Sequence, residues 1–321
     1  TLAMSGGMIV AAFIAKPIAE GLKKRFIKNA KPLNVIICEN LIGADSYLKN
    51  LIKEQIPEYS DRIDKEIGFI EASIGRMVPA LSEEKRQGNP LRVAVEPYNI
   101  LPVDKDAFKT ELDDVKNLYP YSPFNLFIER KLFMHNMSHA LTAYLGNLKG
   151  YEYIYQAVKD FDIRYAAFRA LCQSAEAVAK ENGVDIGFLL SHAENLLFRF
   201  GNRELKDTVE RVGKDTIRKL GNNDRLIGAL LLCEKHGVSC EFICIGVASG
   251  LLFAPTADTN SVEVYTYAKE NGVKLALEKY SNYSGKHVEL IAKIYDMLKA
   301  NKSVAEIVNY CDDLSGKTIR V

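Results

Sequence analysis

The chain has 321 residues, 48% of them hydrophobic, which is long enough for two domains that each bury a core. Its 42 basic and 41 acidic residues give a net charge of +1, so no global field predicts binding to nucleic acid or to a membrane surface. The longest apolar runs, for example residues 229–232, are far too short to cross a bilayer. We therefore expect a soluble cytoplasmic protein.

The first third of the chain alternates between strand and helix patterns. We predict strands at residues 2–4, 35–38, 69–73 and 91–96, helices at 8–28 and 44–55, and a polar loop at 84–90. This alternation is typical of a Rossmann-like α/β domain. Residues 101–122, rich in Asp, Lys, Pro and Tyr, read as a linker.

Helical patterns replace strand patterns after the linker. Amphipathic helices are predicted at residues 164–181, 186–200, 224–236 and 287–300. The expected architecture is a Rossmann-like α/β domain over residues 1–122, linker included, followed by a mostly α-helical domain over residues 123–321.

One predicted helix, starting near Ser122 and Pro123 and ending at residue 146 or 150, is apolar almost all the way round. Within it lie Lys131, Asn136 and His139, whose burial costs free energy unless they have polar partners. At about 100° per residue, Asn136 and His139 project roughly 140° and 80° from Lys131, so one pocket could hold all three. The alternative is a lysine that extends to the surface and an ordinary core histidine.

The six cysteines are Cys38, Cys172, Cys233, Cys240, Cys244 and Cys311. They lie mainly in apolar surroundings without a C-x-x-C pair, which predicts reduced, buried thiols. His236, Cys240 and Cys244 share a helical spacing, but the flanking apolar residues favour core packing over a metal site. No metal is expected.

The segment Glu-Arg-Lys-Leu-Phe at 129–133, followed by Asn136, His139 and Ala-Leu-Thr-Ala-Tyr-Leu-Gly, resembles the signature helix of the mannitol dehydrogenase family. The resemblance extends over nearly the whole chain and is strongest at residues 129–226. It implies that Lys131, Asn136 and His139 are catalytic.

The resemblance also implies a bound NAD, with NADP left open. No G-x-G-x-x-G turn occurs in the chain, and we expect that part of the cofactor domain to precede Thr1. Ser5 and Gly6, between a strand and a helix, are candidate cofactor contacts, although they could simply form a tight turn. Glu39 and Asn40 end a buried strand, where open α/β sheets bind ligands. By resemblance Asn40 also binds the reacting oxygen; the alternative is a turn-forming asparagine.

Candidate substrate contacts lie in two further segments. Residues 70–79 resemble a family motif in which Glu71 and Arg76 would bind substrate, but Gly75 stands where the family generally has an aspartate. Residues 203–225 hold basic side chains interleaved with acids, which suits either a phosphate group or an ion-paired surface. The sequence of this segment resembles that of family members acting on mannitol 1-phosphate more than that of other members. This resemblance implies phosphate contacts by Arg211, Arg218, Lys219 and Arg225.

The resemblance thus implies an NAD-dependent polyol dehydrogenase that interconverts mannitol 1-phosphate and fructose 6-phosphate, with Lys131 as general base. Its partner would be a small-molecule sugar alcohol or sugar phosphate, and the oligomeric state is left open. One alternative is a dehydrogenase of the same family for free mannitol or for a hexuronate such as tagaturonate or fructuronate. Another is a binding protein without redox activity.

Overall fold

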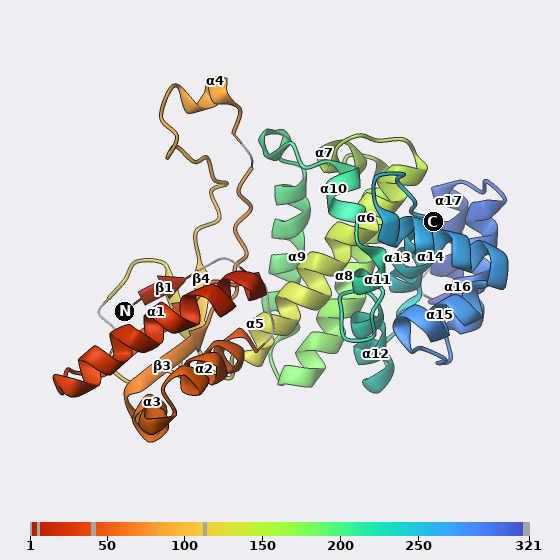
Figure 1. The fold of residues 1–321 in the computed structure, drawn as a ribbon. Helices are drawn as coiled ribbons and strands as arrows, with labels where there is room; N and C mark the ends of the chain where they lie inside the picture. Colours follow the sequence, from red (N-terminus) through yellow and green to blue (C-terminus); the bar gives the residue numbers. More distant parts are fainter. Residues whose placement is uncertain (1, 5–6, 40–42, 80, 112–113, 317–321) are drawn as a thin grey trace. The chain divides into compact units, whose positions relative to one another are not determined.

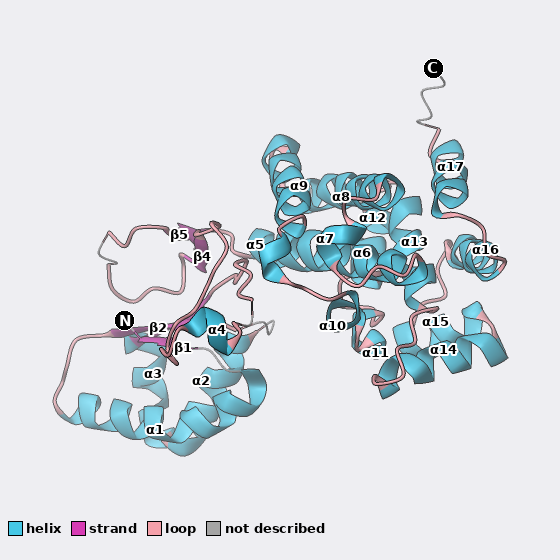
Figure 2. Ribbon diagram, turned by 90° about the horizontal axis from the view of Figure 1, so that it is seen from above, coloured by secondary structure: helices cyan, strands magenta, loops and turns pink. Residues whose placement is uncertain are grey.

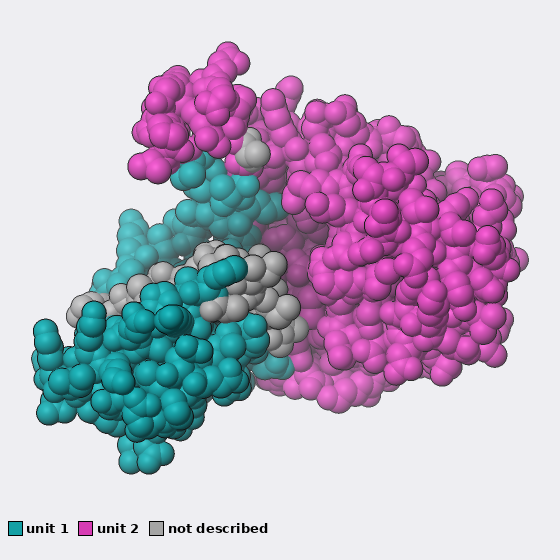
Figure 3. Space-filling model, in the orientation of Figure 1, with its two compact units in different colours: residues 1–78, 93–128 teal, residues 79–92, 129–321 magenta. Residues whose placement is uncertain are grey.

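The computed structural model describes residues 2–4, 7–39, 43–79, 81–111 and 114–316 (Figure 1). The chain divides into two compact units, coloured separately in Figure 3. Unit 1 comprises residues 1–78 and 93–128, and unit 2 comprises residues 79–92 and 129–321. An α/β unit is thus followed by a helical one, as the sequence pattern predicted.

Unit 1 is built on a parallel sheet. Its strands are β1 (Leu2–Met4), β2 (Leu33–Ile37) and β3 (Ile67–Glu71), in the order β1-β2-β3. The connecting helices are α1 (Gly7–Ile27), α2 (Ala44–Gln55) and α3 (Ser60–Glu66), with a 3-10 turn, η1, at Pro57–Tyr59. These helices lie on one face of the sheet (Figure 2). The predicted strand-helix alternation is confirmed over residues 2–71.

Both faces of the sheet are apolar because both are covered. Val35 and Ile37 point to the core formed with α1 and α2, whereas Ile36 points to the opposite core, which includes Val103. Successive strand residues face opposite sides, so a doubly covered strand reads as one continuous apolar run. This explains the uninterrupted Val-Ile-Ile of β2.

The predicted linker contains a second, two-stranded parallel sheet. Strands β4 (Leu101–Asp104) and β5 (Leu118–Tyr121) pair in register from Leu101 with Leu118. The prediction of a plain linker was therefore wrong, because Pro and Asp conceal short strands whose partner lies far along the chain.

The strand predicted at residues 91–96 was also wrong. Leu91, Val93 and Val95 do alternate with polar residues, but all three are exposed and no described strand pairs with them. Alternation indicates a half-buried strand only where a neighbouring strand and a core exist. The predicted loop at 84–90 contains a one-turn helix, α4 (Glu83–Arg86), which Lys85 links to Glu204 by a 2.9 Å ion pair.

In unit 2 every secondary-structure element of the described residues is a helix (Figure 2). The signature segment begins at the end of unit 1 with α5 (Asn125–Glu129) and continues in unit 2 with a π-helix, η2 (Arg130–Asn136), and α6 (Met137–Leu148). The helix starts at Asn125, so the predicted N-cap at Ser122 was wrong; Ser122 instead donates to the Asp106 carboxylate. The other elements are α7 (Ile154–Ala157), α8 (Phe161–Asn182), α9 (Ile186–Phe200), η3 (Arg203–Leu205), α10 (Val209–Gly213), α11 (Thr216–Lys219), α12 (Ile227–Lys235), α13 (Glu241–Gly250), α14 (Thr259–Asn271), α15 (Val273–Ser281), α16 (Val288–Lys299) and α17 (Val304–Leu314).

Helix α6 is the central element of unit 2. It packs against α8, α10 and α13, and its residues from Met137 to Gly146 are buried apart from His139. A helix surrounded on all sides needs apolar residues on all sides, which is the pattern read from the sequence. None of the described helices combines the length and hydropathy needed to cross a bilayer.

Candidate active site

The π-helix η2 aligns two of the predicted catalytic residues. Lys131 and Asn136 are five positions apart, and in a π-helix, which is hydrogen-bonded from i to i+5, such residues stand one above the other. His139 follows three positions later in α6, where an i, i+3 pair is again adjacent. All three side chains are partly exposed, as are Leu132 and Phe133, whereas Met134, His135, Met137 and Ser138 are buried. The local winding therefore gathers Lys131, Asn136 and His139 on one face.

Two neighbouring helices hold this unusual turn in place. Ser174 of α8 donates from Oγ to the Phe133 carbonyl at 2.7 Å, which satisfies a backbone acceptor inside the π-helix. Gly228 of α12 lets the Phe133 ring approach its backbone, because an added Cβ would lie 2.6 Å from Phe133 Cε1. The geometry of η2 thus depends on residues far away in sequence.

Lys131 has the electrostatics of a proton acceptor. Burial lowers the pKa of Lys131, and the nearby Arg225 guanidinium lowers it further, from 10.5 to about 8. An amine with a pKa near neutrality can both accept and return a proton at physiological pH.

His139 is oriented by two contacts. Its ring stacks on Phe200 with centroids 4.6 Å apart, and its Nε2 lies 3.3 Å from Asp207 Oδ2. The second contact has the distance of an ion pair without the geometry of a hydrogen bond. Burial lowers the pKa of His139 despite the opposing effect of Asp207, so the imidazole is neutral near pH 7.

The basic residues predicted from segment 203–225 form an ion-paired cluster in unit 2. Arg211 donates from Nε to Asp207 at 2.6 Å, Arg218 donates from Nε to Asp215 at 2.7 Å, and Arg225 donates from Nε to Asp224 at 2.7 Å. Their exposure differs: 63% of the Arg211 side chain is exposed, 54% of Arg218 and 13% of Arg225.

Lys219 is buried and donates to the backbone carbonyls of Val212 and Lys214. Burial, then Arg225 and Arg218, lower the pKa of Lys219 to about 7. Arg225 acts electrostatically on both lysines, and Lys219 also acts on His139. The cluster therefore lies within electrostatic reach of Lys131 and His139.

Two residues near this site were not predicted as site residues. Asp207 contacts both His139 and Arg211, and Tyr144 of α6 is fully buried with no hydrogen-bond partner for its hydroxyl among the described residues. The sequence showed Asp207 only as one of the acidic residues interleaved with basic ones in residues 203–225, and nothing in it linked Asp207 to His139. Tyr144 read as one more core residue, because a hydroxyl's surroundings cannot be read from helix periodicity.

In unit 1, Glu71 and Arg76 have partners of their own. The Glu71 carboxylate accepts from the backbone N–H groups of Gly43 and Ala44, at 2.8 and 3.2 Å, and so caps α2. Burial, followed by the charge of Asp45, raises the Glu71 pKa. Arg76 is exposed and donates to the Tyr98 carbonyl. A Cβ at Gly75 would lie 3.1 Å from the Tyr98 ring, so this ring crowds the space that an aspartate would need.

The remaining predicted cofactor contacts are mostly outside the described residues. This holds for Ser5, Gly6 and Asn40, while Glu39 is described and follows β2 at the carboxyl end of the sheet. Within the described part of the chain, no group of three or more His, Cys, Asp or Glu side chains is placed to hold a metal ion. His236 pairs with Glu181 at 2.6 Å.

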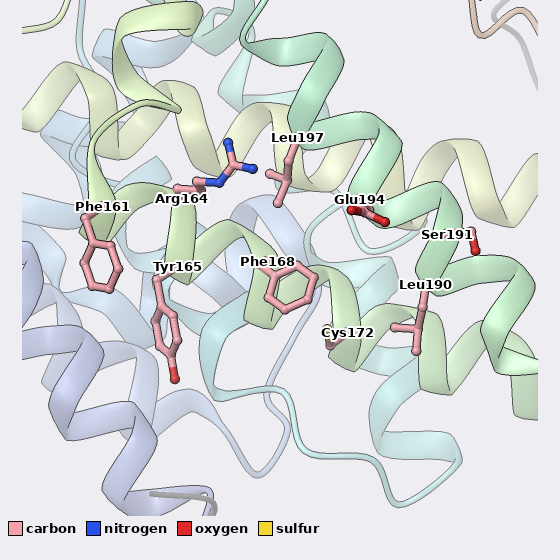
Figure 4. Close-up of a pocket in the computed structure, with 9 residues that line it drawn as sticks. All are labelled: Phe161, Arg164, Tyr165, Phe168, Cys172, Leu190, Ser191, Glu194 and Leu197. Atoms are coloured by element: carbon pink, nitrogen blue, oxygen red, sulfur yellow. The ribbon is translucent and has the colours of Figure 1, made fainter. Parts of the chain in front are cut away.

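A cavity of about 580 Å³ lies between α8 and α9 (Figure 4). Its lining is mostly apolar and aromatic, with Arg164 and Glu194 as its charged residues. It includes none of the predicted catalytic or substrate residues, so we do not assign it to this site.

Comparison with known proteins covers both units. Residues 3–116 match the family model of the mannitol dehydrogenase Rossmann domain, and residues 124–314 match that of the mannitol dehydrogenase C-terminal domain. A mannitol-1-phosphate 5-dehydrogenase from Caldanaerobacter subterraneus subsp. tengcongensis is 37% identical over 281 residues, which is 87% of this chain and 72% of that protein.

Two solved structures share the fold. One is a D-sorbitol dehydrogenase in substrate-free form, with a TM-score of 0.77 and 18% identity, covering 90% of this chain and 65% of that one. The other is a Pseudomonas fluorescens mannitol 2-dehydrogenase in a ternary complex with NAD and D-mannitol, with a TM-score of 0.70 and 20% identity. Here 94% of this chain and 66% of the other are covered, so the chain spans about two thirds of the length of these two proteins.

Proposed function

Because the chain belongs to the mannitol dehydrogenase family, we propose that it is an NAD-dependent polyol dehydrogenase that interconverts mannitol 1-phosphate and fructose 6-phosphate. The observation that carries this proposal is the partly buried Lys131 on the helix face that it shares with Asn136 and His139, where burial and Arg225 lower its pKa to about 8. A lysine tuned in this way suits oxidation of an alcohol, in which a proton leaves the hydroxyl as hydride leaves the same carbon.

Each residue of the face has a distinct role in this proposal. Neutral Lys131 accepts the hydroxyl proton in oxidation, and its ammonium returns it in reduction. Asn136 donates a hydrogen bond to the developing alkoxide, with Asn40 as its proposed second donor. His139, held by Phe200 and Asp207, orients a substrate hydroxyl.

The described residues fit part of a dinucleotide site. The parallel strands β1–β3 end at a common edge, and Glu39 follows β2 there, where open α/β sheets bind ligands. The G-x-G-x-x-G motif with which this fold commonly binds pyrophosphate does not occur in residues 1–321. A bound nicotinamide would supply the hydride acceptor, and we propose Glu39, Ser5 and Gly6 as contacts to the cofactor.

The cationic cluster supports a phosphorylated substrate. The charges of Arg211, Arg218 and Arg225 are balanced by Asp207, Asp215 and Asp224, and Lys219, with a pKa of about 7, adds about half a positive charge at pH 7. Guanidinium groups bind phosphate oxygens well, and exposed Arg218 can exchange an aspartate for a phosphate. The name of the 37% identical relative agrees with this choice.

A second candidate substrate is free mannitol. Each arginine of the cluster already has a carboxylate partner, and such pairing also suits a cluster whose role is to shape the pocket. The Pseudomonas fluorescens relative is named for mannitol without a phosphate.

The experiment that tests the proposal is a substrate comparison. Initial rates of NADH formation would be measured with mannitol 1-phosphate, mannitol and hexonates, and each again with NADP. We expect kcat/KM to be highest for mannitol 1-phosphate with NAD. A kcat/KM at least tenfold higher for free mannitol would contradict the proposal and identify free mannitol as the substrate. No turnover with any substrate would favour a redox-inactive binding protein.

A further inference from the structure

A second group of reactive side chains lies among helices α12, α13 and α16 of unit 2. His287 contacts Cys240 Sγ through Nε2 at 3.4 Å and Glu234 Oε1 through Nδ1 at 2.7 Å. Tyr283 donates its hydroxyl to the same Glu234 oxygen at 2.8 Å. The Cys244 thiol, one turn further along α13, hydrogen-bonds to Cys240. A thiol, an imidazole and a carboxylate thus stand in series beside a second thiol.

This arrangement activates Cys240. The hydrogen bond from Cys244 and the contact with His287 together lower the pKa of Cys240 to about 6, against the opposing effect of burial. The pKa of His287 is raised, chiefly by the hydrogen bond to Cys240. Cys311, buried without such a partner, shows the opposite: burial raises its pKa to about 12. The contact between Sγ and Nε2 therefore favours a thiolate on Cys240 beside a protonated His287.

We propose that Cys240 is a hydroperoxide-reactive thiolate and that Cys244 resolves its oxidation product as a disulfide. A nucleophile beside a base that is itself oriented by a third group is the arrangement of an activated thiol. A low-pKa cysteine next to a resolving cysteine is typical of redox-sensing sites. The catalytic site proposed above uses none of these residues.

The chemistry balances with hydrogen peroxide as the oxidant. The Cys240 thiolate attacks one peroxide oxygen, an S–O bond forms, the O–O bond breaks, and the leaving hydroxide takes the proton of His287 to become water. Cys244 sulfur then attacks the sulfenic sulfur, an S–S bond forms, and the S–O bond breaks. The second hydroxide leaves with the Cys244 proton as water. The two thiols lose the two electrons that reduce the peroxide.

Access requires one local movement. Cys240 is fully buried behind His287, whose side chain is 16% exposed. Residues 282–287, which join α15 to α16, form an irregular surface loop, and such loops open at lower free energy than helices do. Opening of residues 282–286 would displace Tyr283 and admit peroxide, while His287, the N-cap of α16, stays beside the thiolate to give its proton to the leaving hydroxide.

Disulfide formation would strain α13. Side chains one turn apart on a helix have Cβ atoms about 5–6 Å apart, whereas a disulfide needs about 3.5–4.5 Å. Cys240, the N-cap, is outside the helical region with φ −142° and ψ 21°, so it is the residue that can move. Because α13 packs against α6, which carries His139, oxidation should also lower enzymatic activity.

The test is to treat the intact protein with equimolar hydrogen peroxide at pH 7 and to map thiols, disulfides and dimedone adducts by peptide mass spectrometry. We expect a Cys240–Cys244 disulfide to form before Cys38 or Cys172 reacts, although those two are more exposed. Dithiothreitol should reverse it. In Cys244→Ser, dimedone should label Cys240 instead.

Variants of His287 and Glu234 test whether these residues increase the reactivity of the Cys240 thiol. His287→Gln should slow Cys240 oxidation at least tenfold, and Glu234→Gln should slow it less; either variant can serve if the other fails to fold. Cys311→Ser is the matched control and should react like the wild type. The proposal is overturned if Cys38 and Cys172 oxidise while Cys240 stays reduced, or if His287→Gln reacts at the wild-type rate.

Discussion

The protonation of Lys131 should control the pH dependence of both reaction directions. At pH 7 a lysine with a pKa of about 8 is about 10% neutral, whereas one with a pKa of 10.5 is about 0.03% neutral. Burial and Arg225 together therefore raise the fraction of Lys131 that is neutral at pH 7, and so able to accept a proton, roughly 300-fold. We expect kcat/KM for polyol oxidation to rise with pH and to level off above about 8. For reduction, which needs the ammonium form, kcat/KM should fall above the same pH.

Replacing Lys131 by Ala should lower kcat by roughly 10²- to 10⁴-fold, the usual contribution of a general acid-base group. The variant should also lose the inflection near pH 8 in both directions. The assay is NADH absorbance from pH 6 to 10, with circular dichroism to confirm folding. Lys180→Ala, which removes a lysine that is 45% exposed, is the control.

The outcome that would refute the role of Lys131 is specific. If the folded variant kept turnover within tenfold of the wild type and the same pH profile, another group would be the base. A small primary amine added to the Lys131→Ala variant should restore part of the oxidation rate.

Three further results are expected. Arg218→Ala should raise KM for mannitol 1-phosphate about tenfold with kcat nearly unchanged, because a remote phosphate contact binds ground and transition states alike; steady-state kinetics with free mannitol, expected to be unaffected, is the control. Gly228→Ala should lower kcat about 10- to 100-fold, because the new Cβ displaces Phe133 and with it the π-helix, whereas Gly21→Ala, which meets nothing within 4 Å, should have no effect in the same assay. Lys131→Met should stabilise the protein by up to about 3 kcal/mol at pH 7 in urea unfolding, because the folded state then no longer holds a buried ammonium. Between pH 8 and 10.5 Lys131 of the wild type is protonated in the unfolded chain but neutral in the folded protein. The stability difference between variant and wild type should therefore shrink across that pH range and be absent above it.

The elements that the sequence predicted well are those whose pattern is local. Helices α2 and α9 have the predicted bounds, because their apolar spacing and flanking residues suffice to define them. Strands depend on partners that a local pattern does not reveal. For this reason residues 91–96 were predicted as a strand and β4 and β5 were missed.

The sequence predicted which residues belong to the candidate site but not how they are arranged in space. Lys131, Asn136 and His139 stand out because polar groups are rare in an apolar helix. Their separation, estimated at 140° between Lys131 and Asn136 for an α-helix, was wrong because the segment is a π-helix. Its stabilising contacts, Ser174 and Gly228, belong to other helices, and the pairing of His139 with Asp207 likewise depends on the tertiary fold.

The π-helix also determines how this enzyme can tolerate insertions and deletions. Relative to an α-helix, such a turn contains one surplus residue, so removing a single apolar residue such as Leu132 would let the segment relax to regular winding. Every side chain of the segment would survive except one, and Lys131 and Asn136 would then be four positions apart in an α-helix, where residues still share a face. Loss of one residue should therefore be tolerated better in this π-helix than in α6, where regular winding has no surplus residue and a deletion would turn the side chains on one side of it by about 100° relative to those on the other.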